Sequence, residues 1–148
     1  MSFNDNNLTK ILAKLSYPAR SQPAERVAEL LNKIEEQASV SLPEDYRFFL
    51  HHYGEYEVDD REEIIILWKA EDLLEYNDDI GLFEENDGLL FIGSNGGGSY
   101  IFLDFEQTEA SSVVVMDATS INRLDAVVVG SSFTDFLDRV ERNEEWFG

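Results

Sequence analysis

Apolar residues recur along parts of this chain at positions i, i+3, i+4 and i+7, the spacing that gathers them on one face of an α-helix. The pattern predicts helices over residues 8–15, 21–38, 43–53 and 132–140. Pro43 opens the third helix and Gly54 follows it, as expected for a first-turn proline and a left-handed C-terminal cap. Ser132 and Asp135 form a capping pair at the start of the fourth helix. Ser21, in a proline-containing connector, is placed to cap the second.

Between the third and fourth helices the pattern changes to short apolar runs separated by turn-forming residues, which is typical of β-strands. The runs cover residues 64–68, 89–93, 99–105, 113–116 and 126–129, and a short helix is expected over 70–76. The second and third runs predict a β-hairpin, because Gly96, Gly97 and Gly98 between them can supply the positive φ angles of a reversing backbone. Together these elements predict an α+β fold, with helices packed against a single, mainly antiparallel β-sheet of about four to six strands.

A glycine-rich loop after a strand also occurs in phosphate-binding sites, which need the N-terminus of a helix directly after the glycines. In this chain a strand follows the glycines instead. The segment from residue 70 to residue 122 contains twelve carboxylates and no lysine or arginine, so a phosphate there would be repelled. The loop is therefore interpreted as a structural reversal of the chain.

The net charge of the chain is −20, from 11 basic and 31 acidic residues among 148. Such a charge disfavours nucleic acid and anionic membranes and favours basic proteins or cations as partners. The alternative is an acidic surface that only keeps the protein soluble. Since no apolar run is long enough to cross a membrane and no signal-peptide pattern is present, we expect a cytoplasmic protein without a membrane partner.

Candidate catalytic and metal-binding groups carry weak signals. The chain has no cysteine, and the neighbouring His51 and His52 lie about 100° apart on a helix, so they do not converge on one metal. Asp104 and Asp117 are embedded in apolar runs, yet each is better explained as a strand-end residue that binds turn backbone. No calcium-loop spacing occurs. We therefore expect a non-catalytic binding protein that needs no cofactor or metal.

The chain combines three motifs: a leucine-proline helix start at Leu42, a glycine-rich hairpin that ends in Leu-Asp at Asp104, and a final Ser-Phe helix start at Ser132. In this combination the chain resembles the SMI1/KNR4 family of the SUKH superfamily. The positions marked as the structural motif are Leu42, Pro43, Tyr46, Gly93, Gly96, Gly97, Gly98, Asp104 and Phe136. The likeness covers residues 24–142. The whole chain, 1–148, is expected to form one such domain, in which residues 1–20 add an N-terminal helix and connector.

The resemblance implies an α+β domain and a role in immunity, in which the protein binds and neutralises a cognate polymorphic toxin, often a nuclease. An acidic surface suits this role, because it can occupy the basic cleft in which a nuclease holds the phosphate backbone. Two acidic stretches are the predicted contact surfaces: the first, 55–63, is expected to be solvated, and the second, 78–87, is expected to be turn-forming. The predicted partner-binding residues within them are Glu57, Asp59, Asp60, Glu62, Glu63, Asp78, Asp79, Glu84, Glu85 and Asp87. The alternatives are acidic loops without a partner, and a regulatory or scaffold module that binds a host protein. The oligomeric state stays open.

Overall fold

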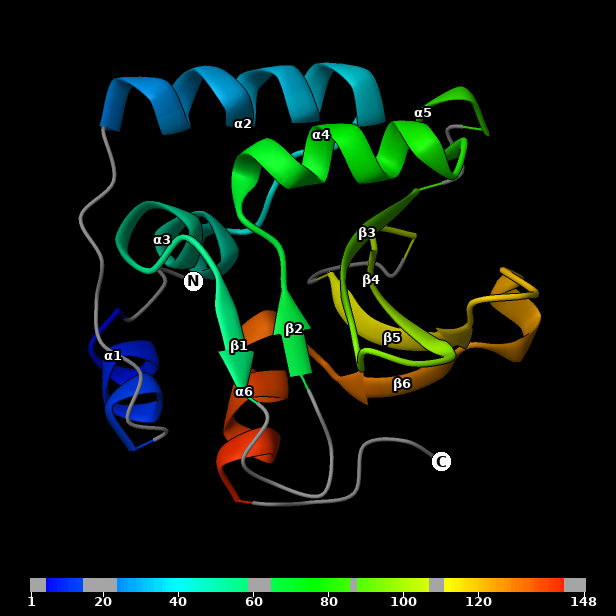
Figure 1. Ribbon diagram of the computed structural model, residues 1–148. Coiled ribbons are helices and arrows are strands. Elements are labelled where there is room, and N and C mark those ends of the chain that lie inside the picture. Colours follow the sequence, from blue (N-terminus) through cyan, green and yellow to red (C-terminus); the bar gives the residue numbers. More distant parts are fainter. Residues whose placement is uncertain (1–4, 15–23, 59–64, 86–87, 107–110, 143–148) are drawn as a thin grey trace.

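The computed structural model describes residues 5–14, 24–58, 65–85, 88–106 and 111–142 (Figure 1). Their helices are α1 (Asp5–Lys14), α2 (Ala24–Ala38), α3 (Glu44–His52), α4 (Ala70–Asp79), α5 (Leu82–Glu85), α6 (Phe133–Glu141) and the 3₁₀-helix η1 (Arg123–Asp125). Their strands are β1 (Tyr56–Val58), β2 (Ile65–Leu67), β3 (Leu89–Ser94), β4 (Ser99–Asp104), β5 (Ser112–Asp117) and β6 (Val127–Gly130). The strands form one antiparallel sheet in sequence order, so the predicted α+β fold is confirmed.

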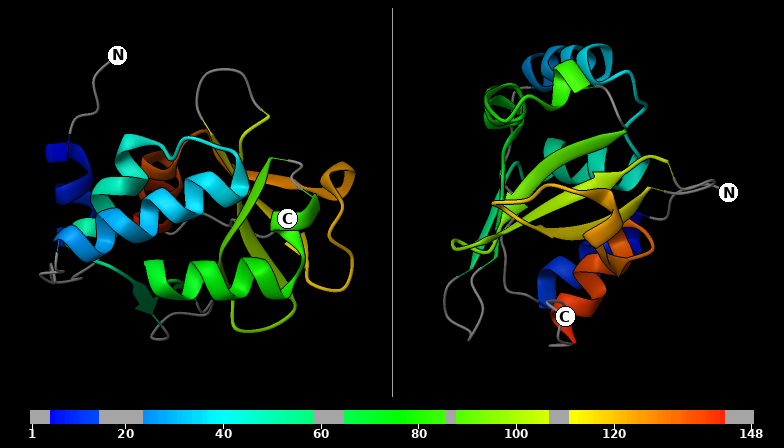
Figure 2. Two further views of the ribbon diagram at one scale, coloured as in Figure 1. Left: turned by 90° about the horizontal axis from the view of Figure 1, so that it is seen from above. Right: turned by 90° about the vertical axis from the view of Figure 1, so that its right-hand side faces the viewer.

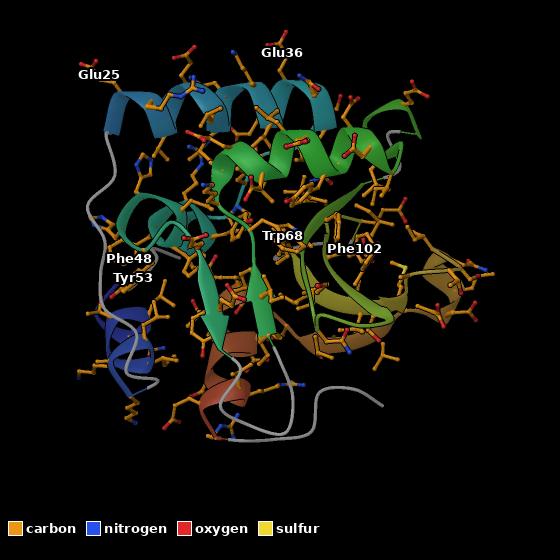
Figure 3. All side chains as sticks on the ribbon, viewed as in Figure 1. Glu25, Glu36, Phe48, Tyr53, Trp68 and Phe102 are labelled. Carbon is orange, nitrogen blue, oxygen red and sulfur yellow. The ribbon has the colours of Figure 1, made fainter. Side chains whose placement is uncertain are left out.

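The sheet buries apolar side chains on both faces, which explains why its central strands are apolar at nearly every position. Phe91, Phe102 and Val114 are register partners on one face and pack with Leu82 of α5 in the smaller of two core clusters. Trp68 lies against this cluster, between α4 and the sheet (Figure 3). The larger cluster covers the other face and includes the buried residues of α1, α2, α3 and α6.

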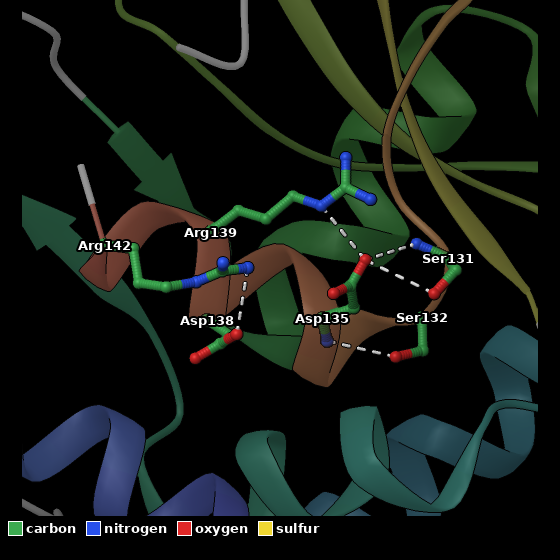
Figure 4. Close-up of polar contacts among 6 residues, drawn as sticks. All are labelled: Ser131, Ser132, Asp135, Asp138, Arg139 and Arg142. Atoms are coloured by element: carbon green, nitrogen blue, oxygen red, sulfur yellow. Dashed lines mark hydrogen bonds and ion pairs between the residues drawn. The ribbon is translucent and has the colours of Figure 1, made fainter. Parts of the chain in front are cut away.

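The Gly54 cap predicted for α3 and the Ser132–Asp135 pair predicted for α6 are confirmed, whereas Pro43 precedes the first turn of α3 instead of lying in it. Gly54 has φ +76° and donates its N–H to the Phe49 carbonyl at 3.0 Å, as a left-handed C-terminal cap does. Ser132 Oγ accepts from the Asp135 N–H at 3.0 Å, and Asp135 Oδ2 accepts from the Ser131 N–H at 2.9 Å (Figure 4). These contacts satisfy N–H groups at the start of α6 that have no partner within the helix. The predicted connector over 16–23, with Ser21, lies outside the described residues.

The described parts of both acidic stretches contain more regular secondary structure than predicted. The first was expected to be fully solvated, but Tyr56–Val58 forms the edge strand β1 and the Tyr56 side chain is completely buried. The second was expected to be turn-forming, but α4 continues to Asp79 and Leu82–Glu85 adds a further helical turn. The reason is tertiary packing, because the buried side chains of Tyr56 and Leu82 hold the backbone of these stretches against the core.

Asn77 connects α4 to the sheet through a buried hydrogen-bonded side chain. Its Oδ1 accepts from the Phe91 N–H at 2.7 Å, and its Nδ2 donates to the carbonyls of Phe91 at 2.9 Å and Leu73 at 2.8 Å. β2 pairs with β3 at Ser94 and Gly93, and the Trp68 N–H donates to the Ile92 carbonyl just beyond them, so the Asn77 amide takes the place of a neighbouring strand at Phe91. This contact sets the position of α4 relative to β3.

Among the described helices, none combines the length and the apolar character required to cross a membrane.

Candidate functional site

The two ends of the sequence motif meet at one buried carboxylate. Asp45, in the first turn of α3, is 8% exposed. Its Oδ2 accepts from the Thr134 N–H at 2.9 Å and the Thr134 hydroxyl at 2.8 Å, while its Oδ1 accepts from the Tyr46 N–H at 2.8 Å. One negative charge thus serves the positive ends of both α3 and α6. Asp45 therefore connects the leucine-proline start of α3 to the Ser-Phe start of α6, although the two are far apart in the sequence.

Replacing Asp45 by alanine is expected to lower the free energy of unfolding by about 2 to 4 kcal/mol, because charge-assisted hydrogen bonds to two helix starts are lost. Urea denaturation followed by circular dichroism measures the effect. Asp125→Ala removes an exposed carboxylate and should change stability by less than about 0.5 kcal/mol. Equal effects of the two substitutions would show that Asp45 does not join the helices.

The glycines of the hairpin motif have different roles. A Cβ at Gly93 would lie 2.1 Å from the Ile66 carbonyl oxygen, so Gly93 allows β2 to approach β3. Gly96 has φ +77° in the exposed turn. Gly97 and Gly98 have no positive φ and Gly98 faces open space, so the prediction that all three glycines supply positive φ angles is correct only for Gly96.

The other motif side chains are structural. Tyr46 and Phe136 are completely buried, Leu42 is 5% exposed, and Pro43 occupies the position before α3. Burial raises the pKa of Tyr46 far above its usual value, so this phenol stays neutral. Asp104 accepts from the Glu106 N–H at 3.0 Å, which confirms its predicted role at a strand end. Asp117, at the end of β5, accepts from the Thr119 N–H at 2.8 Å and from the Thr119 hydroxyl at 2.7 Å. These two hydrogen bonds lower the pKa of Asp117.

The sequence model of the SMI1/KNR4 family (SUKH-1) matches residues 28–139, which is more than half of the chain. The chain belongs to the SMI1/KNR4 family. No curated protein matches it. α1 lies outside the matched region, yet Leu8, Ile11 and Leu12 of α1 are buried in the same core cluster as α2, α3 and α6. In this SMI1/KNR4 chain, the N-terminal helix therefore packs as part of the family core.

The predicted partner-binding residues of this SMI1/KNR4 chain fall into two groups. Glu57 is exposed on the edge strand β1. Asp78 and Asp79 are exposed at the end of α4, and Glu84 is exposed on α5, where Glu85 also belongs to the helix. β1 lies well below α4 and α5 in Figure 1, so the structure does not bring Glu57 to the second group. The remaining candidates, Asp59, Asp60, Glu62, Glu63 and Asp87, lie outside the described residues.

The structure adds α2, which sequence reasoning did not include. α2 and α4 lie side by side, and their carboxyl-terminal ends face the same side of the molecule (Figures 1 and 2). Glu36 near the end of α2 points outward (Figure 3). Glu36, Asp78, Asp79 and Glu84 are called the acidic helix ends below. Amphipathic spacing alone does not give the pairing of two helices, so no signal in the sequence placed Glu36 here.

Basic side chains on α2 pair with carboxylates other than the acidic helix ends. Arg26 lies 3.9 Å from both Glu29 and Glu71, and Lys33 lies 3.7 Å from Glu29. Over the described part of the chain, no ion pair involves any residue of the acidic helix ends. Carboxylates at the negative end of a helix dipole are electrostatically unfavourable. The acidic helix ends therefore form a surface whose charge does not serve the stability of its own helices.

Metal binding finds no support in the described ranges, where no cluster of three or more potential ligands occurs. His51 and His52 occupy the last turn of α3 as predicted. Burial, together with the positive charges of His52 and Arg47, lowers the pKa of His51. The neutral form of His51 is therefore favoured more than in a free histidine.

Proposed function

We propose that this member of the SMI1/KNR4 family is a non-catalytic immunity protein that binds and neutralises a cognate toxin, with the acidic helix ends as its principal contact. The observation that carries the proposal is the family match over residues 28–139, combined with the net charge of −20. The family suits a protein-interaction module, and the charge suits a basic partner. A nuclease is the favoured toxin class, because its active site must attract phosphate, and the cytoplasm is the proposed compartment.

Carboxylates at helix C-termini that form no ion pair with another described residue support the choice of surface. They are repelled by the helix dipole, and a cationic partner that approaches them relieves this repulsion, which favours binding. Because the charges are exposed, we expect them to act mainly on the rate of association, with a strong dependence on salt. Glu57 and its neighbours on the β1 side are a second, separate candidate contact.

The role in immunity is tested by co-expression with the carboxy-terminal domain of a modular toxin encoded directly upstream of this gene. Cells that make the toxin domain alone should stop growing, and cells that also make this protein should grow. Growth arrest that persists in the presence of stable, folded protein would reject immunity. A regulatory or scaffold module of the same fold instead predicts a pull-down partner that is not a toxin.

The acidic helix ends are tested by the double variant Asp78→Lys, Asp79→Lys. The toxin domain should associate about 10-fold more slowly, with a flatter salt dependence, because the local field reverses. Stability should not fall, since lysines at a helix C-terminus are favourable. Association rates measured by stopped-flow fluorescence over a salt series provide the readout.

The matched control is Asp125→Lys, Glu141→Lys, which also changes the net charge from −20 to −16 and lies away from α4. If both double variants slow association equally, only the total charge matters. If neither variant slows it, the acidic helix ends are not the contact.

A further inference from the structure

The strand β6 is the last strand of the sheet on the side opposite β1, and among the described residues one of its edges has no neighbouring strand. Within that part of the chain β6 pairs with β5 alone, and Val127–Gly130 contains no charged residue. Natural proteins usually protect such edges with charges, prolines or covering segments, because an open edge invites pairing with another chain. β1, the other edge, carries the exposed carboxylate of Glu57. The two edges of this sheet are therefore chemically different.

Large apolar side chains are exposed beside this edge. Leu124 is 91% exposed, Val128 54% and Val127 43%. They are the most exposed large apolar residues in the described ranges. Together with the β6 backbone they are called the β6 edge below. Exposed apolar side chains on an edge strand are unfavourable in water unless another segment covers them.

The register shows that both core layers stop at the β6 edge. Val128 pairs with Val114, whose side chain belongs to the smaller cluster, so Val128 continues that row. Val127, the residue before Val128, points to the opposite face of the sheet, and it pairs with Val115 of the larger cluster. An added strand would therefore extend the hydrogen-bonded ladder and both apolar layers together.

Charge identifies the occupant. A two-fold contact places a surface against itself, and on a chain of net charge −20 most surfaces would then meet with like charges opposed. The uncharged β6 edge avoids this repulsion, and it lies away from α2 and α4 (Figures 1 and 2). A basic partner, in contrast, finds no complementary charge in β6. We propose that the β6 edge binds the β6 edge of a second copy of this chain, forming a two-fold dimer with a continuous sheet.

Antiparallel pairing is the arrangement that the flanking charge allows. Asp125 is exposed two residues before β6. Antiparallel strands place the two Asp125 carboxylates at opposite ends of the new ladder, whereas parallel strands would place them side by side. The dimer leaves both sets of acidic helix ends facing solvent. Dimerisation and toxin binding therefore use separate surfaces and fail independently.

Molar mass in solution tests the proposal with the full chain. Sedimentation and light scattering should show a rise with concentration from 16.9 kDa toward twice that mass. Salt between about 0.05 and 0.5 M should strengthen the dimer, because it screens the repulsion between two acidic chains. This sign is opposite to the one expected for a basic toxin. A single 16.9 kDa species at every concentration and salt would overturn the proposal.

A matched pair of variants locates the interface. Val128→Lys should abolish the dimer over the measured concentrations even though it lowers the net negative charge, whereas Gln37→Lys makes the same charge change on exposed α2 and should dimerise as the parent does. If Val128→Lys still dimerises, the contact lies elsewhere. If Val128→Lys leaves the molar mass unchanged but weakens toxin binding, the β6 edge contacts the toxin, and the two-fold β6 contact is rejected.

Cross-linking gives a second readout that does not depend on lysine being tolerated. The chain has no cysteine, so single cysteines can be introduced cleanly. Val128→Cys should form a covalent dimer with a short thiol-specific cross-linker, and Glu57→Cys at the opposite edge should not. Equal cross-linking at both edges, or none at Val128→Cys, would contradict the two-fold β6 contact.

Discussion

Replacing Gly93 by alanine is expected to lower the free energy of unfolding by about 3 kcal/mol or more, among the largest effects of a single methyl group in this protein. The added Cβ would lie 2.1 Å from the Ile66 carbonyl oxygen and 3.0 Å from Leu67 Cδ2. A backbone oxygen cannot rotate away as a side chain can, so β2 must separate from β3. Urea denaturation measures the loss, and amide exchange should show it first in β1 and β2.

The control is Gly98→Ala in the same hairpin. Gly98 has an ordinary backbone conformation, and an added Cβ would meet no atom within 4 Å. Its replacement should change stability by less than about 0.5 kcal/mol. Similar losses for the two variants would mean that the hairpin needs glycine for flexibility, and that close packing of β2 on β3 is not the reason for Gly93.

Replacing Asn77 by leucine is expected to cost about 2 to 5 kcal/mol. The Phe91 N–H and C=O lose their side-chain partner while remaining buried, and each unsatisfied group costs about 1 to 3 kcal/mol. Asn32→Leu makes the same change on an exposed position of α2 and should be nearly neutral. Thermal and urea unfolding provide the comparison, and a small loss for Asn77→Leu would show that α4 is not held to β3 by this amide.

Asn77→Asp separates hydrogen bonding from packing. An ionised carboxylate can accept from the Phe91 N–H but cannot donate to the Phe91 carbonyl. Burial and the unmatched carbonyl both favour the protonated acid, so the pKa of the introduced carboxyl group is raised. A carboxyl group with a raised folded pKa binds more protons in the native state, and its penalty therefore shrinks as the pH falls. The stability difference from the parent protein should narrow at lower pH, and a difference independent of pH would contradict the role of the amide donor.

The helices with strong local signals were predictable from the sequence. Gly54 and the Ser132–Asp135 pair act on backbone groups within one turn of their own helix, so neighbouring residues contain the whole interaction. The hairpin was predictable for the same reason, since β3 and β4 are joined by a short loop. The net charge, and with it the preference for a basic partner, also follows from the residues alone.

Contacts between residues distant in sequence were decided by the tertiary structure. Asp45 meets Thr134 across 89 positions, and Gly93 is required because β2 lies against it. Tyr56 gives β1 its order by entering the core, although acidic neighbours surround it in the sequence.

The candidate surfaces show the same division. The sequence by itself determined the secondary structure with strong local signals, the family likeness and the sign of the charge, because these depend on composition and short-range spacing. Only the tertiary structure placed α2, which carries Glu36, beside α4, separated Glu57 from Asp78 and left Val128 on an edge strand of the described sheet, because packing direction and strand order depend on contacts between distant segments.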